Sequence, residues 1–329
     1  MQEHDVVGIG NAIVDIIAHC DDQFLKTHGC TKGTMHLVDA TAVEKLYDAM
    51  GPAIEVSGGS AANTMVGIAS LGGKAGFIGK IADDAIGRVF AHDIRAAGVT
   101  FTTRPAESGA PSARSLILVT PDGQRTMNTF LGVSSQLGSG EVDEDLVRSA
   151  RVVYLEGYLF DRAEAKAAFR QAAGIAAKAG RQVALTLSDP FCVDRHRAEF
   201  RDLIRFNVDI LVANEAEITA LYQTESFEEA ARQVQAETKL AALTRSEKGS
   251  VILHDGQTIA IAAAPVARVV DTTGAGDLYA AGLLFGIARG LGLETAGRLG
   301  SMAAAEIISH MGARPEVGLL DLAKKNKLL

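Results

Sequence analysis

The sequence predicts an α/β fold of three layers, in which a mainly parallel β-sheet lies between helices and a small β-sheet lid stands off these layers. Three observations support this prediction. Short apolar or β-branched segments alternate with amphipathic stretches along most of the chain. Most of these segments are too apolar to be half-exposed strands, so helices are expected to bury both faces of their sheet. The alternation stops in two places, which we assign to the lid.

The predicted strands are short and rich in Val, Ile and Leu. They are 6–9, 114–119, 152–155, 182–187, 208–212, 240–243, 251–253 and 266–270. The predicted helices carry apolar residues on one face. The first begins at Ser60 and ends at Gly72. The others cover 84–97, 161–179, 227–236, 275–289 and 294–311. In 84–97, for example, Phe90 and Ile94 lie on one face and Gly98 ends the helix.

The lid is predicted from a hairpin and an irregular segment. Strands 114–119 and 125–130 flank a turn in which Pro121 presets φ and Gly123 accepts a positive φ. Segment 16–38 mixes polar and apolar residues without a helical period. Together they predict a small antiparallel sheet, inserted from about 16–38 and 100–131 into a single domain that covers residues 1–329.

The composition excludes several functional classes. The chain has 329 residues with 32 Lys and Arg against 40 Asp and Glu, which gives a net charge of −8. This charge disfavours tight binding to nucleic acid or to anionic membranes, so an anionic ligand would need local hydrogen-bond donors. No apolar stretch is long enough for a bilayer span, and the N-terminus does not resemble a secretory signal. Three cysteines leave one unpaired in any connectivity, which predicts a reducing cytoplasmic location. The sequence is compatible with a monomer or a homodimer.

The segment 269–277 is the richest in chemistry. It predicts a strand that runs through Gly274 and Gly276 into a helix, whose exposed N–H groups could hold a phosphate without a lysine. Asp277 falls in the first helical turn, where its carboxylate could accept the proton of an attacking hydroxyl. The alternative is that Thr272 or Thr273 caps the helix and Asp277 complements its dipole.

The string Asp271-Thr272-Thr273-Gly274-Ala275-Gly276-Asp277 resembles the C-terminal signature of the PfkB, or ribokinase-like, family of sugar and nucleoside kinases. Three further stretches are similar to family motifs and follow in the same order. They are 10–15, 58–63 with 79–87, and Asn214-Glu215-Ala216-Glu217. Segments 186–191, 208–211 and 311–315 are similar to adenosine kinases. The resemblance covers nearly the whole chain.

The resemblance implies a ribokinase-like fold, ATP and Mg²⁺ as cofactors, and transfer of the γ-phosphate to a hydroxymethyl group of a ribose-like acceptor. It implies that Asp277 is the catalytic base and that Gly274, Ala275 and Gly276 form the anion hole. It also implies a set of residues that hold the sugar hydroxyls: Asn11, Asp15, Gly58, Gly59 and Asn63. An ionised carboxylate can accept from two vicinal hydroxyls, and Asn can donate and accept. The alternatives are a turn residue at Asp15 and a first-turn helix residue at Asn63.

The resemblance also assigns residues around ATP. Arg125 on the lid hairpin would approach the phosphates, unless it is one more solvated arginine. Glu217 would orient water around Mg²⁺, although it could also form a capping pair with Asn214. The nucleotide would lie near Asn214, Thr244, Ser246, Gly249, Thr272 and Thr273. Ser246 stands where the family has glycine, which leaves open how closely the backbone approaches ATP. Asp271 is placed for a monovalent cation such as K⁺.

The residues give less support to the competing functions. A dinucleotide-binding dehydrogenase fails because Ile13 stands at the third glycine position, and a Walker-type NTPase fails because Ala75 follows Gly72-Gly73-Lys74. A sensor that lost turnover remains a separate class, which retention of Asp277 argues against. Within the kinases, adenosine or a related nucleoside is preferred over free ribose or a fructose-like sugar. The base would need an apolar slot, for which the candidates are Ile13, Met35, Phe130 and Leu159; each could instead be core.

Overall fold

The computed structural model describes residues 4–329, and its main sheet confirms the predicted mainly parallel architecture. The strand order is β14-β13-β12-β11-β10-β9-β1-β5-β6. All neighbours run parallel except at the β14 edge, where β13 runs antiparallel to both β12 and β14. The strands are β1 (His4–Ile9), β5 (Ala75–Ile78), β6 (Thr100–Phe101), β9 (Ala150–Glu156), β10 (Gln182–Thr186), β11 (Ile210–Asn214), β12 (Leu240–Thr244), β13 (Ser250–His254) and β14 (Gln257–Ile261).

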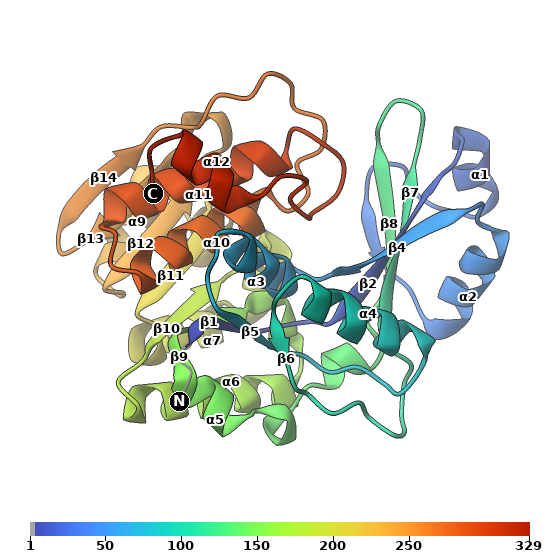
Figure 1. Ribbon diagram of the computed structural model, residues 1–329, viewed down its shortest axis with the longest axis horizontal. Helices are drawn as coiled ribbons and strands as arrows, with labels where there is room; N and C mark the ends of the chain where they lie inside the picture. Colours follow the sequence, from blue (N-terminus) through green and yellow to red (C-terminus); the bar gives the residue numbers. More distant parts are fainter. Residues whose placement is uncertain (1–3) are drawn as a thin grey trace.

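Helices cover both faces of this sheet, so the protein has the predicted three layers (Figure 1). One face packs against α3 (Ser60–Ser70), α4 (Ala85–Ala96), α10 (Ala275–Ala288), α11 (Leu293–Ile307) and α12 (Leu319–Lys325). The other packs against α5 (Glu144–Ser149), α6 (Ala163–Lys178), α7 (Pro190–Asn207), α8 (Glu215–Tyr222) and α9 (Phe227–Gln235). The two cores meet through the sheet: Val6 faces one and its neighbour Val7 faces the other.

The lid is a second sheet that projects from the main layers on the right of Figure 1. Its order is β3-β8-β7-β2-β4. Its strands are β2 (Ile13–His19), β3 (Met35–Leu37), β4 (Ala53–Gly58), β7 (Ala113–Val119) and β8 (Arg125–Phe130), and two helices accompany it, α1 (Asp22–Thr27) and α2 (Ala40–Ala49). Alternate residues such as Val14 and Ile16 bury one face of the lid in the main core.

Three sequence predictions about these elements were wrong in part. The lid is mixed rather than antiparallel, since β2 runs parallel to β7 and β3 runs parallel to β8. The reason is that β2 and β7 both leave the root of the lid in the same direction, while β4 and β8 return to it. The lid also includes β4, whereas β6 belongs to the main sheet.

The segment 266–270 is not a strand. Its Val269 and Val270 are 56% and 37% exposed, and the Val270 amide donates to the carbonyl of Ile308 at 2.8 Å instead of joining a sheet. β-Propensity depends on a neighbouring strand edge to pack against, which this segment does not meet on its way to α10.

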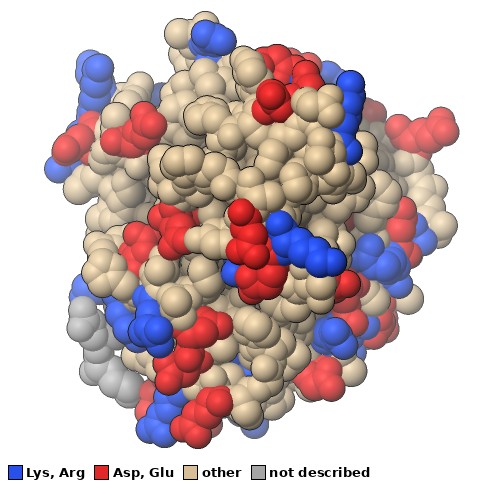
Figure 2. Space-filling view, turned by 90° about the vertical axis from the view of Figure 1, so that its right-hand side faces the viewer, with Lys and Arg blue, Asp and Glu red and all other residues tan. Residues whose placement is uncertain are grey.

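Charged side chains of both signs are interspersed on the side of the molecule that carries the lid (Figure 2). Lys32, for example, pairs there with Asp22 at 2.8 Å and with Asp122 at 2.7 Å. The negative net charge is therefore not gathered into one patch among the described residues of this face. None of the described helices is long and apolar enough to span a membrane.

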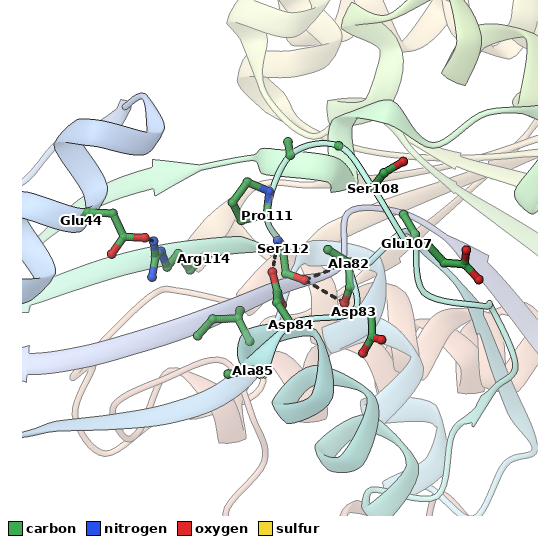
Figure 3. A pocket seen from close by; sticks show the side chains of 14 residues that line it. Glu44, Ala82, Asp83, Asp84, Ala85, Glu107, Ser108, Pro111, Ser112 and Arg114 are labelled. Carbon is green, nitrogen blue, oxygen red and sulfur yellow. Dashed lines mark hydrogen bonds and ion pairs between the residues drawn. The ribbon is translucent and has the colours of Figure 1, made fainter.

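The root of the lid borders a pocket of about 420 Å³ (Figure 3). Asp84 caps α4 by accepting from Gly87 N at 2.7 Å, and its other oxygen accepts from Ser112 N at 2.8 Å. The Ser112 hydroxyl accepts from Ala82 N at 2.9 Å. These bonds stitch the start of α4 to the segment that enters β7. None of the sequence-predicted site residues lines this pocket, so it lies outside the candidate site.

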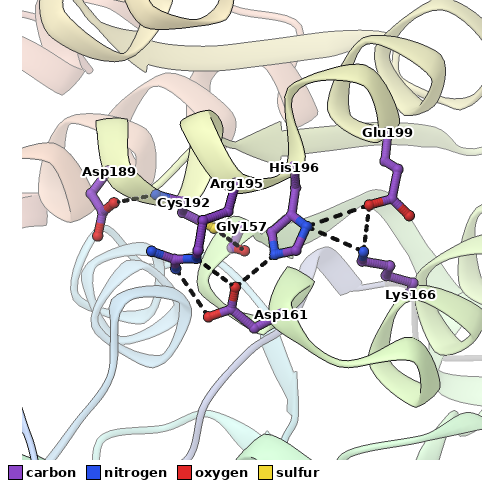
Figure 4. Close-up of polar contacts among 8 residues, drawn as sticks. All are labelled: Gly157, Asp161, Lys166, Asp189, Cys192, Arg195, His196 and Glu199. Atoms are coloured by element: carbon purple, nitrogen blue, oxygen red, sulfur yellow. Dashed lines mark hydrogen bonds and ion pairs between the residues drawn. The ribbon is translucent and has the colours of Figure 1, made fainter.

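Helix α7, which the sequence did not predict, is kinked at His196, where φ is −129° and ψ is 23°. The kink carries the imidazole to Asp161, with Nε2 2.7 Å from Oδ1, and to Lys166, with Nδ1 3.3 Å from Nζ (Figure 4). Arg195 forms a bidentate pair with the same Asp161 at 3.0 Å for both bonds. The many charged residues of α7 give it a low mean hydropathy, so its apolar face is not apparent in the sequence.

Candidate active site

The side chain of Asp277 lies in the first turn of α10 and is held by helix α3. The Ser60 hydroxyl donates to Oδ1 at 2.6 Å, and Asn63 Nδ2 donates to Oδ2 at 3.0 Å. Thr64 donates to the Asp277 carbonyl at 3.1 Å. Burial raises the pKa of Asp277, while the bonds from Ser60 and Asn63 oppose the rise. The carboxylate is thus fixed in position and is a stronger base than an exposed Asp.

Backbone amides at the start of α10 are open beside this carboxylate. Gly274 is the N-cap with φ of 78°, a conformation that favours glycine. The amide of Ala275 turns back to the Thr272 carbonyl at 3.2 Å, and the Leu278 amide bonds to Gly274 O at 2.8 Å. The amides of Gly276 and Asp277 have no acceptor within the described part of the chain. A Cβ added at Gly276 would meet nothing within 4 Å, so there is space in front of this turn.

Asp15 approaches from the lid. It lies on β2 beside Val56 of β4 and Ser115 of β7, on the sheet face opposite to buried Val14. Burial raises the pKa of Asp15 to about 6, and the charges of Arg314 and Arg125 oppose the rise. Burial and neighbouring charges, and no hydrogen bond from the described residues, account for this shift, which leaves the carboxylate oxygens available to a ligand.

Gly58 and Gly59 connect the lid strand β4 to α3 at this point. A Cβ on Gly58 would lie 2.4 Å from Asp15 Oδ2, and one on Gly59 would lie 2.2 Å from the Asn11 carbonyl oxygen. Gly59 also adopts φ of 97°. A side chain at either position would collide with these neighbours, so glycine permits the close approach. The predicted residues that meet at this point are Asn11, Asp15, Gly58 and Gly59.

Glu156 was missed by the sequence reasoning. It is 1% exposed at the end of β9 and accepts from the Asn11 amide at 3.2 Å, from Asn11 Nδ2 at 2.7 Å and from Ala61 N at 2.8 Å. Ser134 donates to Asn11 Oδ1 at 3.0 Å. Burial raises the pKa of Glu156 to about 7, against these hydrogen bonds. A charged residue directly after the apolar run 152–155 is the sequence signal that could have identified it.

Arg125 and Asp271 meet across the lid and the main domain. They form an ion pair in which both side chains are less than 10% exposed. Asp271 also accepts from the amide and hydroxyl of Thr273 at 3.0 and 2.8 Å, and from Gly312 N at 2.9 Å. The lid arginine thus reaches the loop that leads into α10. The Asp271 carboxylate, predicted to face a monovalent cation, is occupied here by the guanidinium.

Asn214 and Glu217 form the capping pair that the sequence allowed. The Asn214 side chain accepts from Glu217 N at 2.8 Å, and Glu217 accepts from Asn214 N at 3.0 Å and Nδ2 at 2.6 Å. Glu217 is 5% exposed, and burial raises its pKa to about 7. Asp189 and Asp277 also raise the pKa of Glu217, which places both carboxylates nearby.

The turn 244–249 keeps glycine-like geometry although it lacks the first glycine of the family pattern. Ser246 adopts φ of 50° and Gly249 adopts φ of 81°. Arg245 N donates to the Gly249 carbonyl at 2.7 Å, which closes the turn between β12 and β13. Thr244 ends β12 and is partly buried, while Thr272 is exposed. The serine therefore accepts strain of about 1 kcal/mol without opening the turn.

The four predicted apolar residues separate into two pairs. Ile13 and Met35 lie on the face of the lid that carries Asp15, and Met35 is 43% exposed. Phe130 pairs with Arg114, one residue out of phase with Asp15, and packs against the main core. Leu159 is 2% exposed within the core beneath α6 and α7. Of the four, only Ile13 and Met35 lie on the lid face that carries Asp15, and Met35 lies three strands away from it, on β3.

Comparison with known proteins decides the family. Residues 53–317 match the pfkB family carbohydrate kinases. The chain belongs to this family. A 5-dehydro-2-deoxygluconokinase of Shouchella clausii is 28% identical to this kinase over 275 residues, which are 77% of this chain and 80% of that protein.

Two solved structures resemble this kinase over their full length. A probable sugar kinase protein from Rhizobium etli is 50% identical with a TM-score of 0.93, and covers 100% of both chains. An adenosine kinase from Sinorhizobium meliloti is 52% identical with a TM-score of 0.91, and covers 98% of this chain and 99% of that one. The ribokinase-like fold, the kinase class and the family prediction are therefore confirmed, with a phosphotransferase acting on a sugar or nucleoside hydroxyl.

Proposed function

We propose that this kinase transfers the γ-phosphate of ATP to the 5′-hydroxymethyl group of a nucleoside, adenosine or a close relative. The observation that carries the chemistry is the arrangement of Asp277. Its carboxylate is fixed by Ser60 and Asn63, is buried enough to be a good base, and lies one residue from the open amide of Gly276. These are the two groups that phosphoryl transfer to an alcohol needs: a proton acceptor and an anion site.

In this proposal Asp277 accepts the proton of the acceptor hydroxyl while that oxygen attacks the γ-phosphorus. The bond from this phosphorus to the oxygen that bridges to the β-phosphate breaks, and ADP leaves with that oxygen. The amides of Gly276 and Asp277, at the positive end of α10, stabilise the negative charge on the transferred group. Arg125 would exchange Asp271 for phosphate oxygens as the lid closes on ATP. The protein contributes mostly position and charge, as is usual for this reaction.

The acceptor would be held between the lid and α3. No hydrogen bond from the described residues contributes to the pKa of Asp15, and Asn63 Oδ1 is buried without a hydrogen-bond partner within the described residues. Such an acceptor atom is rare in a folded protein and is expected to find a donor. A ribose with two neighbouring hydroxyls would satisfy Asp15 and Asn63 together.

No three His, Cys, Asp or Glu side chains of the described residues form a direct metal-binding cluster, so Mg²⁺ would be held by ATP and water, with a carboxylate behind the water. Glu217 is a buried carboxylate near Asp189 and Asp277, and its oxygens keep lone pairs beyond those used by Asn214. Bound Mg²⁺ would neutralise the charge of the ATP phosphates. Glu217 would hold it through water, and the Asn214 cap would keep Glu217 in place.

The nucleoside preference is supported by the 52% identity to the Sinorhizobium meliloti adenosine kinase and by the apolar residues Ile13 and Met35 on the lid face that carries Asp15. A free sugar is the second candidate, because the relatives also include sugar kinases such as the 5-dehydro-2-deoxygluconokinase. The deciding experiment incubates the protein with ATP, Mg²⁺ and a panel of nucleosides and sugars, and identifies the product by mass. We expect a nucleoside 5′-monophosphate.

Two other results have distinct meanings. Phosphorylation of a free sugar with adenosine untouched would replace the nucleoside by a sugar and leave the kinase proposal intact. Binding of a panel member without any phosphorylated product would instead indicate a sensor. The Asp277→Asn variant is the control, because it should remove product formation in either kinase case.

A further inference from the structure

Arg314 ties the root of the lid to helix α3. Its Nε and Nη2 donate to the Ser57 carbonyl oxygen at 2.8 and 2.6 Å, and Nη2 also contacts the Ser57 hydroxyl at 2.8 Å. Its Nη1 donates to the Ala62 carbonyl at 3.1 Å. Ser57 belongs to β4 and Ala62 to α3. One guanidinium therefore spans the point at which the chain passes from the lid into the main domain.

Ser57 is held from its other side as well. Its amide donates to Asp93 Oδ2 of α4 at 2.7 Å, and the residue is 1% exposed. The next two residues are Gly58, which lies against the Asp15 carboxylate, and Gly59, which lies against the Asn11 carbonyl. A shift of Ser57 would therefore move the backbone that shapes the acceptor site.

The charge of Arg314 faces three carboxylates from three elements: Asp15 on β2, Asp93 on α4 and Asp277 on α10. Burial lowers the pKa of Arg314 to about 10, which still leaves it charged at neutral pH. The other titratable groups around these carboxylates are Arg125, which faces Asp15, and Tyr154, Glu156, Tyr158 and Glu217, which face Asp277. Arg314 is the cation common to Asp15 and Asp277.

We propose that Arg314 is a positioning residue for acceptor binding: through Ser57 and Ala62 it fixes Gly58, Gly59 and Asp15 in the geometry that receives the acceptor, and its guanidinium supplies the positive charge that faces Asp15 and Asp277. The inference rests on the proposed kinase function. The contacts of Arg314 are with Ser57 and Ala62 rather than with reacting atoms, so it acts through its neighbours. Its role needs both the planar guanidinium, with its several donors, and the positive charge. Substitution by Lys keeps the charge without the planar group, and substitution by Gln removes the charge.

The test compares wild type, Arg314→Gln and Arg314→Lys, with Arg232→Gln on the exposed surface of α9 as the matched control. The acceptor is the panel member that the wild type phosphorylates. We measure kcat and KM for that acceptor, the pH profile of kcat/KM, and thermal unfolding. In Arg314→Gln the acceptor KM should rise about tenfold or more, and the acid limb should move to higher pH by about one unit, which is tenfold in kcat/KM on that limb.

Arg314→Lys keeps the charge and loses the planar group. We expect its acid limb to stay near the wild-type position while the acceptor KM remains raised. A purely structural role would lower the unfolding temperature and the active fraction without moving either the KM or the acid limb, and that result would overturn the inference. If Arg314→Gln does not fold, Arg314→Lys decides: a raised KM supports the inference and an unchanged KM overturns it.

Failure of the inference and failure of the proposed function give different results. A wild type that phosphorylates no panel member contradicts the proposed kinase function, whatever the variants do. An active wild type whose KM and acid limb are unchanged in Arg314→Gln contradicts only the role of Arg314. The Arg232→Gln control should match the wild type in all four measurements.

Discussion

Asp277 and Asp15 approach the same site from different sheets, and they are held there by different means. Asp277 of the main domain accepts hydrogen bonds from Ser60 and Asn63, whereas only burial and neighbouring charges, with no hydrogen bond from the described residues, act on Asp15 of the lid. Each interacts electrostatically with Arg314. Under the proposed function, this difference means that Asp277 is in place before the acceptor binds, while Asp15 keeps its hydrogen-bonding capacity for the acceptor.

The two sheets differ in the same way in their packing. Main-sheet strands such as β9 are buried on both faces by helices. The lid buries one face through Val14 and Ile16, and its other face leaves Leu37 60% and Ile54 71% exposed. A sheet with one open face can present side chains to a ligand without disrupting a core. Under the proposed function, the main domain would supply the groups for phosphoryl transfer, and the open face of the lid would contact the acceptor.

The largest effect is expected from Asp277→Asn. Asparagine keeps the shape of the side chain and cannot accept the proton, so kcat should fall by at least about a hundredfold. The loss of a buried charge should leave the unfolding temperature equal to or above that of the wild type. Steady-state kinetics and a thermal melt measure both. Near wild-type turnover would show that Asp277 is not the base and that the two carboxylates do not differ in the proposed way.

Asp15→Asn tests the lid carboxylate, which is proposed to bind the acceptor. We expect the acceptor KM to rise by about ten- to a hundredfold, since a hydrogen bond to a charged group contributes about 1.5–3 kcal/mol. The turnover number should change far less than in Asp277→Asn. Kinetics with saturating ATP and varied acceptor separate the two parameters. A fall in kcat with unchanged KM would show that Asp15 takes part in the chemical step.

Glu156→Gln tests whether the pKa of the buried carboxyl group beside Asn11 is raised in the folded protein. Because the pKa of Glu156 is raised to about 7, the folded protein holds a proton that the unfolded chain loses above the usual range near 4.5. Stability contributed by this group should therefore fall as pH rises between about 4.5 and 7, by on the order of 3 kcal/mol in total. Urea unfolding at several pH values should show a flatter pH dependence for Glu156→Gln. An unchanged slope would contradict the raised pKa.

The sequence was informative wherever function depends on neighbours along the chain. The glycines and Asp277 of α10 follow from one short string, and the apolar strands predict a parallel sheet with both faces buried. The contacts of Glu156 with Asn11 could not be predicted in the same way, because 145 residues separate the two and their approach depends on the pairing of β1 with β9. The same holds for the parallel pairing of β2 with β7, which local turn signals do not encode.

Placement of apolar residues was harder still, because one residue along a strand decides the face. Phe130 and Thr129 are neighbours on β8, yet Thr129 shares its row with Ser115 and Asp15, while Phe130 pairs with Arg114 on the other face. A strand prediction without its register cannot distinguish the two. Leu159 shows the same limit, since its turn after β9 buries it in the core.

Leu37→Ala should have the smallest effect and would sharpen the contrast between the two faces of the lid. Leu37 pairs with Thr129, in the row that contains Ser115 and Asp15, and it is 60% exposed. Its loss should change the free energy of unfolding by no more than about 0.5 kcal/mol. The acceptor KM should rise a few-fold, since removing part of an apolar contact costs about 1 kcal/mol. Phe206→Ala, on a side chain that is 78% exposed at the end of α7, is the matched control and should leave KM unchanged. Equal KM values in both variants would mean that the open face of the lid does not touch the acceptor.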